Sequence, residues 1–161
     1  MRRVALVLAL TGCHPVARPT ARALPTPSVQ VGACAKPGQD GVVSGSPRLE
    51  RADRDLNGDG TPETIVTDRA MCSADGNCYW NVFVAGADCA RYAGTFEGSA
   101  LEPLTSRGDD NMIDVRSYYN LHGGRLVLQS YRFTRGGYGI VDALLCKRGS
   151  DDQLECAESE H

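Results

Sequence analysis

Residues 125–133 read RLVLQSYRF, residues 135–137 read RGG, and residues 140–146 read IVDALLC. The two longer segments are rich in β-branched, aromatic and aliphatic residues, and the glycine pair between them suits a tight turn. Neither segment has the i, i+3, i+4 spacing of an amphipathic helix. We therefore predict two strands joined by a turn, and this hairpin sets the pattern for the rest of the chain.

The same pattern extends toward the N-terminus. Further strands are predicted at residues 48–53, 63–68, 79–84, 89–96 and 114–119, with another turn at residues 122–124. Residues 59–63 and 110–114 line up as two related starts, each followed by strands, and the two units end near residues 96 and 146. We expect an all-β fold, either a small antiparallel sandwich or one curved meander, built from two related three-stranded units.

The first thirteen residues resemble a bacterial lipoprotein signal. Two arginines precede an apolar run at residues 4–10, which is too short to span a membrane but has the length of a signal-peptide core. Residues 10–13, LTGC, match the lipobox. The resemblance implies that residues 1–12 are removed and that Cys13 carries palmitate-like acyl chains in a membrane of the cell envelope. His14 favours the outer membrane; a secretory signal with an unmodified Cys13 is the alternative.

The sequence suggests three regions and an exported location. After the signal, residues 13–30 form a tether rich in Pro, Ala and Thr, and residues 31–161 form the β domain. The formal net charge of −3 and the lack of a basic run argue against a nucleic-acid partner.

Without Cys13, six cysteines remain, an even number that predicts disulfides in an exported chain. Six cysteines allow fifteen pairings. Cys72 and Cys78 flank an Asp-Gly turn pair, and a turn near Asp151 would place Cys146 opposite Cys156. Cys34 and Cys89 then remain for each other. A zinc site is the alternative, but the sequence has no Cys-x-x-Cys pair to support it.

Residues 55–63, DLNGDGTPE, carry oxygen ligands at alternate positions: Asp55, Asn57, Asp59 and Glu63, with the carbonyl of Thr61. Glycines at positions 58 and 60 permit the tight winding that would turn these oxygens inward. Such a set of hard oxygen ligands suits Ca²⁺. The alternative is a solvated loop in which the Asp and Asn side chains bond to their own backbone.

The loop is not an EF-hand, because the twelfth position counted from Asp55 is Val66 rather than Glu, and Leu56 is bulky. It resembles instead the FG-GAP or VCBS-type calcium loop between β-strands, with Glu63 where that family usually has Asp. The resemblance implies a calcium site in a β domain. The related segment at residues 108–111 lacks the first two ligands, so we expect a turn there.

The sequence contains no nucleophile elbow, phosphate loop or clustered histidines. We therefore expect a non-enzymatic lipoprotein whose β domain binds a structural Ca²⁺ and presents a surface to an envelope or extracellular partner, either a protein or a glycan. Tyrosines and arginines near two turns would suit such a surface, although ordinary strand packing explains them better. The alternative function is a small cell-envelope hydrolase or protease-inhibitor-like domain that uses the acidic loop.

Overall fold

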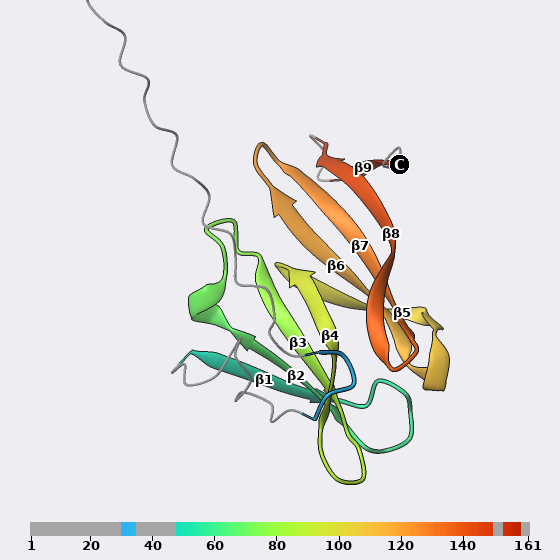
Figure 1. The fold of residues 1–161 in the computed structure, drawn as a ribbon. Helices are drawn as coiled ribbons and strands as arrows, with labels where there is room; N and C mark the ends of the chain where they lie inside the picture. The colour runs from blue at the N-terminus through green and yellow to red at the C-terminus, as the bar shows by residue number, and fades with distance from the viewer. Residues whose placement is uncertain (1–29, 35–47, 150–152, 159–161) are drawn as a thin grey trace, which may run out of the picture.

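The computed structural model describes residues 30–34, 48–149 and 153–158, and these residues form two antiparallel sheets (Figure 1). The first sheet contains β1 (Leu49–Arg54), β2 (Glu63–Asp68), β3 (Cys78–Val84) and β4 (Arg91–Gly98). The second contains β5 (Ala100–Arg107), β6 (Ile113–Leu121), β7 (Arg125–Thr134), β8 (Gly137–Arg148) and β9 (Leu154–Glu158). The all-β sandwich prediction is confirmed.

Each sheet is a meander whose strands lie in chain order. The first sheet has the four strands that the sequence predicts, whereas the second has two more, β5 and β9. The two expected three-stranded units are present as β2–β4 and β6–β8. β1 and β5 precede them as edge strands, and β9 extends the second sheet. β5 contains Pro103 and is mostly exposed, and β9 is rich in acidic residues, so neither has the alternation of a half-buried strand.

Two short 3₁₀ turns complete the described structure: η1 (Arg69–Met71) between β2 and β3, and η2 (Asp109–Asn111) between β5 and β6. The turn predicted at residues 108–111 is thus present. Within the described ranges, no helix has the length and hydropathy needed to cross a membrane.

The sheets meet through β4, which packs against β6 and β8. Phe96 of β4 is fully buried, and its ring makes edge contacts with Tyr131 at 5.0 Å and Tyr138 at 4.8 Å between centroids. The chain passes from one sheet to the other at Gly98, where φ is +156° and a Cβ atom would lie 2.7 Å from the Tyr118 carbonyl oxygen. Glycine therefore permits the close approach of the sheets at this crossing.

Three disulfides connect the six cysteines in the pairs that the sequence favours: Cys34–Cys89, Cys72–Cys78 and Cys146–Cys156. Cys146 and Cys156 lie opposite each other on β8 and β9. The Cys34–Cys89 bond closes the longest loop, with a sequence separation of 55 residues. In the chain-entropy model a loop of that length corresponds to about 4 kcal/mol of stabilisation.

Candidate metal-binding loop

Residues 55–62 connect β1 to β2, and the Asp55 carboxylate holds this loop in a wound conformation. Its Oδ1 accepts a hydrogen bond from the Gly58 N–H at 2.7 Å, and its Oδ2 accepts one from the Gly60 N–H at 3.0 Å. Gly58 and Gly60 have φ values of +83° and +86°, which other residues rarely adopt. The Asp-Gly spacing of the sequence thus specifies the winding of the backbone.

Asn57 and Asp59 continue the same pattern of local hydrogen bonds. Asn57 Oδ1 accepts from the Asp59 N–H at 2.9 Å, and Asn57 Nδ2 donates to Asp59 Oδ2 at 2.9 Å. Asp59 Oδ1 accepts from the Thr61 N–H at 2.6 Å. The hydrogen bonds from Asn57 and Thr61 lower the pKa of Asp59, so this exposed carboxylate is ionised at neutral pH.

Glu63 lies at the base of the loop and is only 1 % exposed, whereas Asp55 and Asp59 of the loop are exposed. Its Oε2 accepts a hydrogen bond from the Leu56 N–H at 2.8 Å. Burial raises the pKa of Glu63, and the negative charges of Asp59 and Asp55 raise it further. Glu63 takes part in none of the ion pairs between described residues. The charge of this buried carboxylate is therefore opposed by two like charges of the loop, and no ion pair between described residues offsets it.

The loop is attached to the second sheet. The Leu56 side chain is 4 % exposed and belongs to the core between the sheets, and the Leu56 carbonyl accepts from the Ile113 N–H at 2.9 Å. The Asn57 carbonyl accepts from Asn111 Nδ2 at 2.6 Å. The bulky residue that distinguishes the loop from an EF-hand is thus the one that anchors it in the core.

Sequence reasoning did not identify Leu56, Asn111 and Ile113 as neighbours. The internal repeat contained the relevant signal, because it aligned residues 59–63 with residues 110–114. In the structure, the two loops that precede β2 and β6 lie against each other. The loops that match in the repeat therefore also form a contact across the sandwich.

Among the described residues, His, Cys, Asp and Glu side chains form no group of three placed to hold a metal ion. The loop side chains bond to their own backbone, as the solvated-loop alternative describes. The calcium assignment to Asp55, Asn57, Asp59, Thr61 and Glu63 thus stays a prediction. The predicted lipidation site, Cys13, lies outside the described residues.

The other residues that the sequence suggests for a binding surface do not form one exposed rim. Tyr131 and Tyr138 are buried in the core, and the Tyr138 hydroxyl donates to the Ile113 carbonyl at 3.0 Å. Arg132 pairs with the buried Asp114 at 2.8 Å. Strand packing, the preferred explanation of this set, agrees with these contacts.

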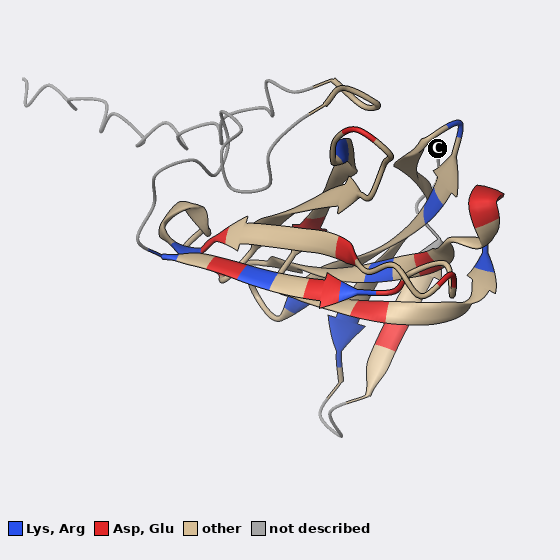
Figure 2. Ribbon diagram, turned by 90° about the horizontal axis from the view of Figure 1, so that it is seen from below, with Lys and Arg blue, Asp and Glu red and all other residues tan. Residues whose placement is uncertain are grey.

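Charged residues of both signs are interspersed over the two sheets (Figure 2). His122 is exposed in the turn between β6 and β7, and its Nδ1 lies 3.3 Å from Oδ1 of Asp75.

Comparison of this chain with protein-family models, with curated proteins and with solved structures finds no match.

Proposed function

We propose that this chain is a non-catalytic lipoprotein of the bacterial cell envelope whose loop at residues 55–63 binds a Ca²⁺ ion that stabilises the β-sandwich. The lipobox supports anchoring through Cys13, with the outer membrane as the location. Three disulfides suit an oxidising compartment. The domain then presents a surface to a protein or glycan partner in the envelope or outside the cell.

The donor chemistry of the loop fits a hard cation. Ca²⁺ takes six to eight oxygen ligands, and the loop offers three carboxylates, one side-chain amide and a main-chain carbonyl. The carboxylates of Asp55 and Asp59 each accept two hydrogen bonds, whereas an ionised carboxylate has about four acceptor positions. Acceptor capacity therefore remains for an ion, and a cation would supply the opposing charge that buried Glu63 lacks.

The attachment of the loop to the second sheet is the observation that carries the stabilising role of the ion in this proposal. Leu56 packs in the core, and the carbonyls of Leu56 and Asn57 accept hydrogen bonds from Ile113 and Asn111. Because the loop belongs to the first sheet, these contacts join the two halves of the sandwich. An ion that binds only the wound loop would therefore stabilise the whole domain by mass action.

The test is a calcium titration of stability on the full chain carrying Cys13→Ser, purified with its disulfides formed. Dissociation constants of ~10⁻⁴–10⁻³ M are typical of extracellular modules. At 10 mM Ca²⁺, the free energy of unfolding should then rise by about 1.4–2.7 kcal/mol. Mg²⁺ should have a smaller effect, because it demands a tighter octahedral site.

Two variants make the test specific. Asp59→Asn should abolish the rise with Ca²⁺, whereas Asp88→Asn, which changes an exposed aspartate between β3 and β4, should keep it. An unchanged free energy of unfolding in 10 mM Ca²⁺, or an equal rise in both variants, would contradict the proposal.

A further inference from the structure

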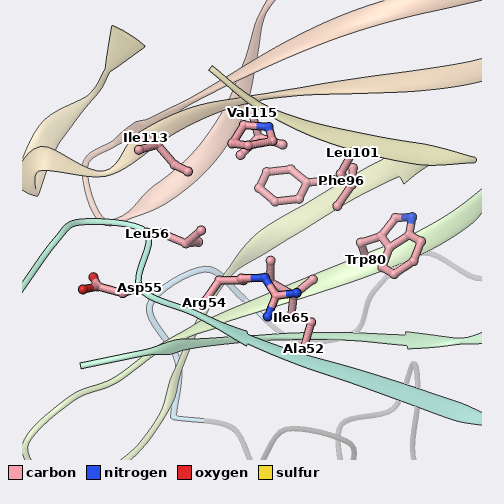
Figure 3. Close-up of a pocket in the computed structure, with 11 residues that line it drawn as sticks. Ala52, Arg54, Asp55, Leu56, Ile65, Trp80, Phe96, Leu101, Ile113 and Val115 are labelled. Atoms are coloured by element: carbon pink, nitrogen blue, oxygen red, sulfur yellow. The ribbon is translucent and has the colours of Figure 1, made fainter. Parts of the chain in front are cut away.

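A pocket of about 280 Å³ opens between β1 and β5, the edge strands of the two sheets (Figure 3). The first sheet contributes Ile65, Trp80 and Phe96 to its walls, and the second contributes Leu101, Ile113 and Val115. The Trp80 Nε1 donates to the Gly98 carbonyl at 3.0 Å, so the polar atom of this side chain is already satisfied. The walls are therefore apolar on both sides.

The pocket is an open part of the core. Ile65, Trp80, Leu101 and Ile113 all line it, and these four side chains pack against the central cluster yet remain partly exposed. Phe96 and Val115 behind them are buried. Apolar surface that remains in contact with water between two sheets is a favourable place for an apolar ligand, because a ligand would complete the burial that folding leaves undone.

Two charged residues, Arg54 and Asp55, line the pocket, and only Arg54 is available to a ligand there. Both carboxylate oxygens of Asp55 accept from glycine N–H groups of the loop, and in Figure 3 this carboxylate points away from the apolar side chains. Arg54 is exposed, and its Nη1 donates to the Asp53 carbonyl at 2.9 Å. A guanidinium has five N–H donors, so Arg54 retains donors for an anion at the pocket.

We propose that this pocket binds an anionic amphiphile, with its apolar chain between the sheets and its head group on Arg54. A cavity of about 150 Å³ holds benzene, or about 25 Å³ for each carbon atom, so a pocket of this volume holds a chain of about ten carbons. A single medium-length acyl chain with a carboxylate meets both requirements. This inference does not depend on calcium binding.

The test measures binding of decanoate to the full chain carrying Cys13→Ser, below the critical micelle concentration and without added calcium. Trp80 is the only tryptophan of the chain and lines the pocket, so its emission reports directly on occupation. Decanoate should bind saturably, and 10-bromodecanoate should quench Trp80 because bromine quenches indole fluorescence on contact. A failure of the brominated chain to quench would place the ligand elsewhere and overturn the proposal.

The head group is tested by comparing decanoate with decyltrimethylammonium. We expect decanoate to bind about tenfold more tightly, as a charge-assisted hydrogen bond implies. Arg54→Gln should remove this preference. Arg51→Gln is the matched control, because Arg51 lies on the same strand outside the pocket and bonds to Asp53 and Thr64. Equal affinity of the two amphiphiles for the parent protein would refute the anionic head group.

The position of the acyl chain of the ligand is tested by filling the pocket. Leu101→Trp and Ala52→Phe introduce larger side chains at lining positions on opposite sheets. Each variant that retains cooperative urea unfolding should bind decanoate at least tenfold more weakly. Undiminished affinity in a folded variant would show that the acyl chain does not enter this pocket. The quenching measurement gives an answer even where both variants unfold.

Discussion

Truncation of Leu56 to alanine measures how strongly the candidate loop is connected to the sandwich. The side chain is 4 % exposed and belongs to the central core cluster. Leu→Ala changes at buried sites cost about 2–5 kcal/mol, through lost transfer free energy and the cavity that remains. Leu56 also lines the open pocket, so its removal enlarges a space that water reaches. We therefore expect the lower part of the range, about 2–3 kcal/mol.

Urea unfolding of the full chain carrying Cys13→Ser, followed by Trp80 emission, gives this free energy directly. The slope of free energy against urea should stay constant, because the variant changes the native contacts and not the extent of surface exposed on unfolding. The matched control is Leu145→Ala on β8, where the side chain is 41 % exposed. That control should change the stability by less than about 1 kcal/mol.

A loss below about 1 kcal/mol for Leu56→Ala, or a loss equal to that of Leu145→Ala, would refute the reasoning. The loop would then be attached to the second sheet only through hydrogen bonds, and the structural role proposed for the ion would lose its physical basis. A loss of the expected size supports the view that the order of the loop and the packing of the sheets belong to one cooperative unit.

Two further predictions concern positions outside the loop. Burial tends to raise the pKa of Asp114, but hydrogen bonds from Arg132 and a serine hydroxyl outweigh it and hold the pKa below its ordinary value of 3.8. Asp114→Asn should therefore lower the free energy of unfolding in urea at pH 7 by about 2 kcal/mol, less than for a fully buried pair because Arg132 is half exposed. The difference in stability between the two proteins should shrink below about pH 4, because the unfolded chain takes up a proton at Asp114 before the folded chain does. A difference that stays constant with pH would contradict this. Gly108→Ala would place a Cβ atom 2.2 Å from the Phe133 carbonyl oxygen and should lower the free energy of unfolding by about 1–3 kcal/mol. Gly139→Ala is the control and should be tolerated, because the space around its Cβ position is open. Equal effects of the two changes on the urea midpoint would argue against the close approach at Gly108.

The sequence predicts well those strands whose composition and alternation are typical of a β-sheet. β2 was expected at residues 63–68 and has these bounds, because β-branched residues fill it and a loop with glycines precedes it. β5 was missed because Pro103 and exposed polar residues do not alternate. Such an edge strand is specified by its neighbour β6, and the identity of that neighbour is a tertiary fact that local pattern does not contain.

The candidate loop shows the same division. Its winding follows from local rules, since Asp55 and Asn57 bond to N–H groups of residues two to five positions further on and the glycines take positive φ values. Its attachment to the core was not predictable in this way. The contacts of Leu56 and Asn57 with residues near 111–113 span more than fifty positions of sequence.

The contacts between the loop before β2 and the segment before β6 make the candidate site part of the sandwich rather than an isolated surface loop. The loop before β2 contributes Leu56 to the core, and the segment before β6 contributes Met112, which is 1 % exposed. The two segments thus close the same end of the core from opposite sheets and bond to each other there. Of the two segments, only the loop before β2 is long and rich in oxygen ligands. An ion held by this loop would stabilise contacts that both sheets share. The effect of the ion should therefore appear in global unfolding rather than in local order alone.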